Sequence, residues 1–269
     1  MLAHRVAPGD PVKLSEIDPD ERGPFEDKHD PKALELSMAL AARLDALQEK
    51  LYAAQSQSLL VVLQAMDTGG KDGVLRSVVG PLDSRGVHVE SFKAPTPDER
   101  AHDFLWRCHA KTPRAGEITF FNRSHYEDVL VTRVLDLVPK TTWKPRYELI
   151  NDFERLLEHS GTAVVKVFLH ISKDEQKARL EARLADEAKQ WKFDPGDLKM
   201  RARWDDFQEA YEDALSKCTS KSAPWFVVPA NRKWYRDLAV REILVETLEK
   251  MDPQQPTVHW DAKAIVIPD

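Results

Sequence analysis

Residues 58–73 read SLLVVLQAMDTGGKDG and decide the fold of this chain. The first seven residues form a continuous apolar run, which is typical of a central parallel strand buried on both faces. The two adjacent glycines that follow predict a tight turn, and a helical pattern begins after them. A buried strand, a glycine-rich turn and a helix in succession indicate an α/β protein.

Similar apolar runs recur along the chain with helical patterns between them. Alternating strands and helices predict right-handed crossovers and a three-layer fold, with a parallel sheet covered by helices on both faces. Further strands are expected at 87–92, 117–121, 163–170 and 225–229, and helices at 31–55, 74–83, 97–111, 125–135, 147–160, 173–188, 198–218 and 233–251. Ligands of such sheets bind at the carboxyl ends of the strands.

The composition bounds the class of protein. With 269 residues, 42% of them hydrophobic, the chain can bury a core as a single domain. Two cysteines are too few for a disulfide framework, and no apolar run is long enough to cross a bilayer, so we expect a cytoplasmic protein without membrane contact. A net charge of −6 argues against a general nucleic-acid binder.

The ends of the chain differ from its body. Residues 1–30 are rich in Pro, Asp and Gly and predict an N-terminal arm, either flexible or lying across the surface. Residues 31–269 are expected to form one domain. The tail 252–269 has three prolines and ends in a short apolar run, which we expect to pack back on the body.

The loop at residues 65–73 has the composition of a phosphate cradle. Gly69, Gly70 and Gly73 allow the backbone N–H groups to point at phosphate oxygens, and the following helix adds its positive N-terminal end. Lys71 supplies a mobile positive charge for a phosphoryl group in transfer. The alternative is an ordinary glycine-rich turn with a surface lysine.

Three residues of this loop depart from the usual phosphate-binding pattern. Ala65 stands where the first glycine is usual, and Asp72 stands where a metal-binding Ser or Thr usually follows the lysine. Asp67 places a carboxylate among the expected phosphates, so it either shapes the turn or binds Mg²⁺, which takes one or two carboxylates together with substrate phosphates.

Four blocks, in order, resemble the polyphosphate kinase 2 family. They are AMDTGGKDG at 65–73, GEITFFNRSHYEDVLVTRV at 116–134, RLEARLADEAKQWKFDPGDLKMRARWDDF at 179–207 and APWFVVPANRKWYR at 223–236. The resemblance implies a P-loop kinase-like fold with a helical lid at about 175–197. The implied activity is transfer of the terminal phosphate of polyphosphate to AMP or ADP, with Mg²⁺ (or Mn²⁺) as the metal.

The details are most similar to class III, whose members phosphorylate both nucleoside monophosphates and diphosphates. Asn122 stands where many relatives carry Asp, which removes one metal carboxylate, and Glu127 nearby could replace it. The resemblance also implies adenine nucleotides, with guanine nucleotides as an alternative, and a homo-oligomer, either a dimer or a tetramer.

Residues from two segments complete the predicted site. Arg123 follows a strand, so its guanidinium can bind phosphate oxygens in a forked manner, or else form a structural ion pair. Glu127 lies one helical turn beyond it and would place the metal or the acceptor, unless it is a solvated carboxylate. Together with Asp67, Asn122 and Arg183, Arg123 is assigned to the nucleotide.

Arg179 and Arg183 are four residues apart and so share one helix face. The resemblance places both in the lid, where they would close on the phosphates, although the same pair could be a solvated face. The basic character continues through Lys189, Lys192, Lys199, Arg201 and Arg203. We assign Arg179, Arg183, Lys189 and Arg201 to polyphosphate binding, together with residues 69–73. Trp191, Phe193 and Trp204 are interpreted as core anchors rather than stacking platforms.

Two other functions fit parts of this pattern. An ATP-dependent nucleoside monophosphate kinase would share the fold and the lid, but Ala65 and Asp72 argue against it. A polyanion-binding module without catalysis would leave the carboxylate of Asp67 without a purpose. The predicted mechanism is direct in-line transfer without a phosphoenzyme.

Overall fold

The computed structural model describes residues 1–260, 264, 265, 267 and 268, and it contains a six-stranded sheet. The strands lie in the order β1-β6-β5-β2-β4-β3, with β2 to β6 parallel and β1 antiparallel to β6. Their bounds are β1 His4–Arg5, β2 Ser58–Ala65, β3 Val87–Ser91, β4 Ile118–Asn122, β5 Thr162–His170 and β6 Trp225–Pro229. The prediction of an α/β fold with a parallel sheet is confirmed.

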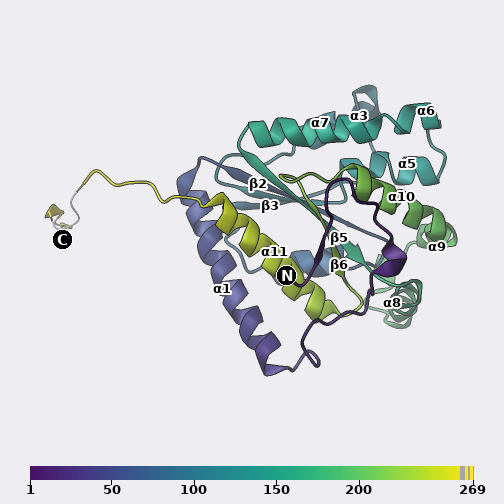
Figure 1. The fold of residues 1–269 in the computed structure, drawn as a ribbon, viewed down its shortest axis with the longest axis horizontal. Helices are drawn as coiled ribbons and strands as arrows, with labels where there is room; N and C mark the ends of the chain where they lie inside the picture. The colour runs from purple at the N-terminus through teal and green to yellow at the C-terminus, as the bar shows by residue number, and fades with distance from the viewer. Residues whose placement is uncertain (261–263, 266, 269) are drawn as a thin grey trace.

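Helices cover both faces of the sheet (Figure 1). α1 and α11 pack together on one face, whereas α7 and α10 lie on the other, where Lys166 and Phe168 of β5 contact Glu154 and Tyr211. The longer helices are α1 Pro31–Ala54, α7 Arg146–His159, α8 Lys173–Ala185, α9 Gly196–Ala202, α10 Trp204–Lys217 and α11 Lys233–Met251. The shorter ones are α2 Lys71–Val74, α3 Pro97–Ala101, α4 Trp106–His109, α5 Val131–Val134 and α6 Lys140–Trp143. Short 3-10 or π turns are η1 Leu14–Glu16, η2 Leu75–Val79, η3 His125–Asp128 and η4 Gln190–Lys192.

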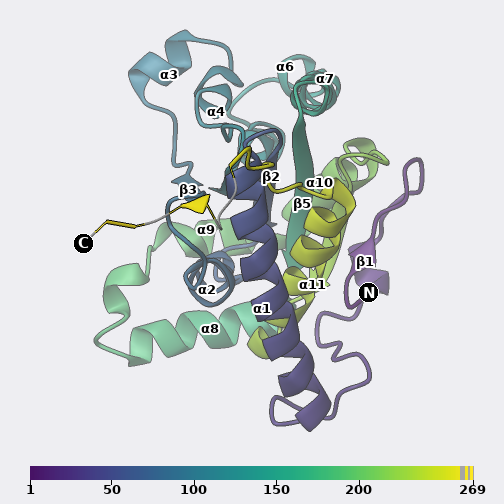
Figure 2. The same ribbon diagram turned by 90° about the vertical axis from the view of Figure 1, so that its left-hand side faces the viewer.

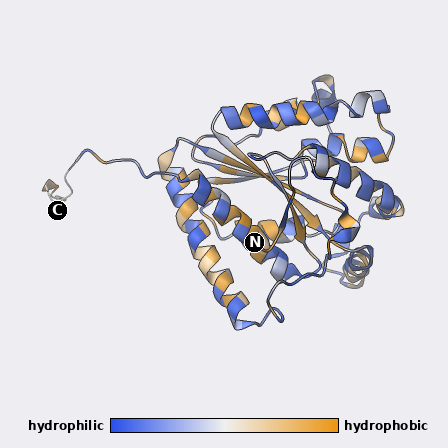
Figure 3. Ribbon diagram, viewed as in Figure 1, coloured by the Kyte–Doolittle hydropathy of each residue, from blue (hydrophilic) through white to orange (hydrophobic). Residues whose placement is uncertain are grey.

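The core lies between the sheet and these helices. β2 is buried along its whole length, as expected for a central strand with helices on both faces. Figure 3 shows the strands as mostly hydrophobic, while the helices carry both hydrophobic and hydrophilic residues. Because β2 is central, the loop that follows it lies in the middle of the carboxyl edge of the sheet.

Several expected helices are divided in the structure. The segment 97–111 is interrupted at His102, whose backbone is extended, and the carboxylate of Asp103 then accepts from the N–H groups of Leu105 and Trp106 at the start of the next helix. The segment 198–218 is interrupted at Arg203, whose ψ of 26° leaves the helical region. The segment 74–83 contains the end of α2 and the π turn η2. The segment 125–135 contains the 3-10 turn η3 and the short helix α5. The helical spacing of apolar residues does not show where a side chain such as that of Asp103 bonds to the local backbone and interrupts a helix.

The first 30 residues lie across the surface of the fold. β1 extends the sheet beside β6, and Leu14 and Phe25 are buried. The tail, in contrast, leaves the body after α11 (Figures 1 and 2). Val258, Trp260 and Ile267 are exposed, so the expectation that the tail packs back is wrong for its described residues. Residues 261–263, 266 and 269 lie outside the described part.

None of the helices in the described part of the chain has an apolar stretch long enough to cross a bilayer.

Candidate active site

The loop between β2 and α2 has the strained backbone of a ligand-binding turn. Thr68 has φ of 61° and Gly70 has φ of 107°, both in the left-handed region that ordinary side chains disfavour. An added Cβ at Gly69 would lie 2.4 Å from Cβ of Ala65, so the turn is too tight for a side chain there. Positive φ at a residue other than glycine is typical of functional loops.

Lys71 begins α2 and turns back over the loop. Its ammonium donates to the carbonyl oxygen of Ala65 at 3.1 Å and lines the cavity above the loop. Burial lowers the pKa of Lys71, and the positive charge of Arg123 lowers it further, while Asp67, Glu127 and Asp72 oppose this shift. An anionic ligand in the cavity would favour the charged form of Lys71.

Arg123 lies at the carboxyl end of β4 and faces the loop. Its Nη2 is 2.9 Å from Oδ1 of Asp67, and its Nη1 is 3.6 Å from Oε2 of Glu127. Burial lowers the pKa of Arg123, but Glu127 and Asp67 outweigh burial and raise it. The side chain is 41% exposed, so the same guanidinium forms ion pairs and remains accessible from the cavity.

Asp67 and Glu127 are the carboxylates that could hold Mg²⁺. Both flank Arg123, and burial raises the pKa of Glu127 against the opposing charges of Arg123 and Lys71. No cluster of three metal-binding side chains occurs among the described residues. Two carboxylates nevertheless fit an ion that takes its other ligands from substrate phosphates and water.

The two unusual positions of the motif contact each other. Nδ2 of Asn122 donates to Oδ1 of Asp72 at 3.0 Å, and this links the end of β4 to the start of α2. Asp72 therefore has a partner within the protein where related loops place a hydroxyl for the metal.

The first turns of α8 hold the loop between β2 and α2 through its carbonyl groups. Nε2 of Gln176, which is fully buried, donates to the carbonyl oxygen of Asp67 at 3.0 Å. Nη1 of Arg179 donates to the carbonyl oxygen of Thr68 at 2.9 Å, and its Nη2 donates to those of Ala230 and Asn231. Arg179 lines the cavity and at the same time joins the loop to the end of β6.

The other residues predicted in the lid and in the helix after it differ in whether they line the cavity. Arg183 and Lys189 line the cavity, and Nη1 of Arg183 is 3.7 Å from Oδ2 of Asp197. Arg201 does not line it, because its Nη1 donates to the carbonyl oxygen of Lys173 and to Oε1 of Gln176. Trp191 is 78% exposed, so its interpretation as a core anchor is wrong, whereas Trp204 is buried.

These residues surround a cavity of about 710 Å³ at the carboxyl edge of the sheet. Ten basic side chains and four acidic ones line it, although the whole chain has a net charge of −6. The basic residues are Lys71, Arg76, Lys93, Arg123, Arg179, Arg183, Lys189, Lys192, Lys233 and Arg236, and the acidic ones are Asp67, Asp72, Asp194 and Asp197. Such a local excess of positive charge fits a polyanion.

Our reading of the sequence missed four of these basic residues. Lys93 follows β3, and Lys233 and Arg236 lie in the first turn of α11, which follows β6. Arg76 lies beyond Lys71 in the same helical segment. The rule that ligands bind at the carboxyl ends of strands would have found three of them.

A smaller cavity of about 180 Å³ adjoins the first and shares Asp67, Arg123, Asp194 and Asp197 with it. Its other walls are Glu127 and less polar groups, among them Phe207 and Tyr211. The carboxylates and Arg123 thus separate a strongly basic cavity from a partly apolar one.

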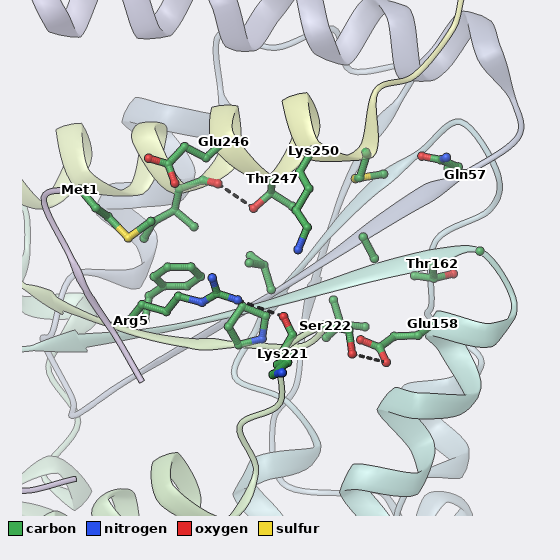
Figure 4. Close-up of a pocket in the computed structure, with 18 residues that line it drawn as sticks. Met1, Arg5, Gln57, Glu158, Thr162, Lys221, Ser222, Glu246, Thr247 and Lys250 are labelled. Carbon is green, nitrogen blue, oxygen red and sulfur yellow. Dashed lines mark hydrogen bonds between the residues drawn. The ribbon is translucent and has the colours of Figure 1, made fainter. Parts of the chain in front are cut away.

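Another cavity, of about 420 Å³, lies at the opposite edge of the sheet, at the starts of β5 and β6 (Figure 4). It has charges of both signs, with Arg5, Lys221 and Lys250 against Glu158 and Glu246. Arg5 already donates to the carbonyl oxygen of Lys221. This mixed lining lacks the positive excess of the cavity around Lys71.

The comparisons with known proteins agree with this geometry. A family model described as polyphosphate kinase 2 matches residues 27–256. The chain belongs to the polyphosphate kinase 2 family. It is 50% identical to an AMP/ADP-polyphosphate phosphotransferase of Meiothermus ruber over 267 residues, 99% of this chain and 100% of the relative. It is 40% identical to an ADP-polyphosphate phosphotransferase of Rhodopseudomonas palustris, over 94% of this chain and 91% of the relative.

A solved structure of the family is also similar. The polyphosphate kinase 2 of Arthrobacter aurescens TC1 superimposes with a TM-score of 0.91 and 47% identity, over 97% of this chain and 92% of that one. The family resemblance and the expected kinase fold are therefore confirmed.

Replacing Asp197 with asparagine tests the electrostatics of the cavity. Burial and the nearby Asp67 raise the pKa of Asp197 to about 6, against Arg183. A raised carboxyl pKa means that the folded protein binds this proton more tightly than the unfolded chain. The contribution of Asp197 to the free energy of unfolding therefore falls as pH rises from about 4 to 6.

We expect Asp197→Asn to raise the thermal midpoint at pH 7 relative to the wild type, and to change it little at pH 4. Thermal unfolding of both proteins across this range measures the difference. Asp205→Asn, a change at an acid outside the cavity lining, serves as the control. An Asp197→Asn midpoint that is lower than wild type at pH 7 would show that the ion pair with Arg183 dominates instead.

Proposed function

We propose that this protein transfers the terminal phosphate of polyphosphate to AMP and to ADP. The observation that carries the proposal is the cavity with ten basic side chains against four acidic ones, in a chain that is acidic overall. A polyphosphate chain has about one negative charge per phosphate. A strongly basic groove therefore fits a long polyphosphate chain better than it fits a short anion. Both relatives described above are named as polyphosphate phosphotransferases, and one is named for AMP and ADP together.

The loop of residues 67–73 binds the reacting end of polyphosphate in this proposal. Lys71 neutralises the charge on the phosphoryl group as it moves. Arg179 and Arg183 on α8, and Lys189 beyond its end, bind the rest of the chain from the wall of the cavity. α8 itself projects from the body of the fold (Figure 2). Arg201, which bonds to Lys173 and Gln176, supports the base of α8 rather than the substrate.

The acceptor nucleotide lies in the smaller cavity beside Arg123. Its phosphate oxygen attacks the terminal phosphorus, and the bond between that phosphorus and the bridging oxygen breaks, which leaves a shortened polyphosphate. The attacking oxygen is already anionic, so no general base is needed. Arg123 orients the acceptor phosphate, and Asn122 maintains the contact between β4 and α2 through Asp72.

Asp67 and Glu127 would hold Mg²⁺ in this scheme. Mg²⁺ bound there would offset the charge of the phosphates. The two side chains also hold Arg123 from both sides, so they orient the cation that contacts the acceptor. Asp67→Asn is expected to weaken both roles.

A donor assay tests the proposal directly. Purified protein is incubated with Mg²⁺ and long-chain polyphosphate, with AMP or ADP added separately, and the nucleotides are resolved over time. ADP and then ATP should appear from AMP, and ATP from ADP. Transfer from ATP to AMP without transfer from polyphosphate would instead support a nucleoside monophosphate kinase. Binding of polyphosphate that is unchanged in Asp67→Asn, without any transfer, would support a polyanion-binding module.

Class III activity, a homo-oligomer and a cytoplasmic location remain predictions. Formation of ATP from AMP by the one protein would establish the first, and sedimentation of the purified protein would establish the second. Both cysteines, Cys108 and Cys218, are buried and free, which fits a reducing compartment.

A further inference from the structure

Arg236 is a buried arginine that contacts the phosphate loop from the last helix. It lies in the first turn of α11, is 3% exposed, and lines the large cavity. Its Nε and Nη2 donate to Oδ1 of Asp237, at 2.8 and 2.6 Å. The carboxylate of Asp237 thus holds the edge of the guanidinium group formed by Nε and Nη2. Nη1 lies on the side of the group away from Asp237.

The free edge lies against two glycines of the loop. A Cβ added at Gly70 would be 2.2 Å from Nη1 of Arg236, and a Cβ added at Gly73 would be 2.8 Å from Nη2 and 3.0 Å from Nη1. Gly70 has a positive φ and would be glycine for that reason alone. Gly73 lies within α2 and has an ordinary backbone, and the nearest atoms to its added Cβ all belong to the guanidinium of Arg236, which Asp237 holds in place.

Arg236 also lies in a cluster of like charges. Burial lowers the pKa of Arg179; Glu175 opposes that shift, while Arg236 and Arg183 lower the pKa further by repulsion. Among the described residues, Nη1 of Arg236 has no hydrogen-bond acceptor. Arg236 lines the cavity, so an anionic oxygen bound there can accept from Nη1, and hydrogen bonds of this charged kind are the stronger ones.

We infer that Arg236, held by Asp237, is a further phosphate-binding residue of the cradle, and that Gly73 is glycine in order to admit its guanidinium. The inference rests on the proposed function, since it assigns the ligand as polyphosphate. It gives the third glycine of the motif a role in packing, in place of a role in turning the backbone. It also explains why the helix after β6 contributes to a site built around β2.

Arg236→Ala should weaken polyphosphate binding by about 10- to 100-fold, which is the usual range for one hydrogen bond to a charged group. Binding is measured with long-chain polyphosphate alone, at several salt concentrations. Removal of a contacting cation should also make the affinity less dependent on salt, which a purely structural change would not do. Arg236→Gln provides a second variant of more similar size.

Arg241→Ala is the matched control. Arg241 lies on the same helix and donates to Ser37 and to the carbonyl oxygen of Ser77, but it does not line the cavity. Its loss should lower the thermal midpoint while leaving both the polyphosphate affinity and its salt dependence unchanged.

Gly73→Ala tests the steric part of the inference. In the wild-type background the new methyl group should displace the guanidinium and weaken polyphosphate binding by about 10-fold, a typical coupling between residues in contact. In the Arg236→Ala background the same change should cost less than about 3-fold.

An equal penalty for Gly73→Ala in both backgrounds, or an Arg236→Ala protein with unchanged affinity and salt dependence, would overturn the inference while leaving the proposed function in place. A wild-type protein that does not bind polyphosphate would overturn both.

Discussion

Lys71→Ala should lower the rate of phosphate transfer from polyphosphate by about 100- to 1,000-fold, the usual loss when one preorganised donor of a transition state is removed. The ammonium lies over the loop, bonded to the carbonyl oxygen of Ala65, and has the charges of Asp67, Glu127 and Arg123 around it. Lys71 is the only basic residue of the loop at 65–73, so the loop holds no second cation at this place. Formation of ADP from AMP and polyphosphate, measured at saturating substrates, gives the comparison.

Lys177→Ala is the control for this change. Lys177 lies on α8, is 63% exposed, and among the residues that the structure describes it forms an ion pair with Glu181 alone, at 3.8 Å. Its removal deletes the same charge from the protein but should change the rate less than 2-fold, since exposed pairs contribute little. Equal losses in the two variants would mean that total charge, rather than the position of Lys71, determines the rate.

Lys166→Met should lower the free energy of unfolding by about 3–5 kcal/mol, because it leaves a buried carboxylate without its cation. Lys166 and Glu154 form an ion pair between β5 and α7, and both side chains are buried. Oε1 of Glu154 also accepts from the hydroxyl of Tyr126, and Nζ of Lys166 donates to the carbonyl oxygen of Cys218. For a chain of this size the thermal midpoint should fall by about 10 °C.

The double variant Lys166→Met, Glu154→Leu is the matched comparison. It removes both charges and should recover part of the lost stability, because apolar groups of similar volume can replace a buried ion pair, while Tyr126 and His125 lose the carboxylate that they contact. A double variant less stable than Lys166→Met would contradict this account. The contacts of Glu154 with Tyr126 and His125 would then outweigh the cost of leaving its carboxylate without Lys166.

The same pair predicts a dependence on pH. Burial raises the pKa of Glu154, but Lys166 and His125 outweigh it, and the net shift is downward from the ordinary 4.5. A carboxyl group with a depressed pKa in the folded state stabilises the protein above its ordinary pKa, and this contribution is lost as pH falls through the lower value. The wild type should therefore lose stability below about pH 4.5, and the double variant should lose less.

The network also supports the segment that carries Arg123 and Glu127. Both His125 and Tyr126, which lie between these two residues, contact the carboxylate of Glu154 from α7. Arg123 has φ of 62°, in the left-handed region that side chains disfavour. Such a conformation persists where the surrounding packed residues hold it in place. Stability of the core and geometry of the site thus depend on the same buried residues.

The sequence by itself determined the strands, the loop and the family. A short, mostly apolar run such as residues 58–64 is typical of a central strand or a buried helix, and the glycine-rich turn that follows it distinguishes between the two. All five parallel strands lie within two residues of the expected ranges. The position of Lys71, Asp67 and Arg123 in one site was also predictable from their place after strands, because parallel strands bring their carboxyl ends to one edge.

Only the tertiary structure decided which charges meet. Lys166 appears in the sequence as a lysine inside an apolar strand, and nothing in its neighbourhood indicates Glu154 as its partner. Arg236 and Gly73 are far apart in the chain, so the sequence suggested a backbone role for the glycine, whereas the structure places a guanidinium over it. The hydrophobic period and the secondary-structure propensity of a segment depend on its neighbours in sequence. Ion pairs and close packing depend instead on how the helices lie on the sheet, which is determined only when the whole core forms.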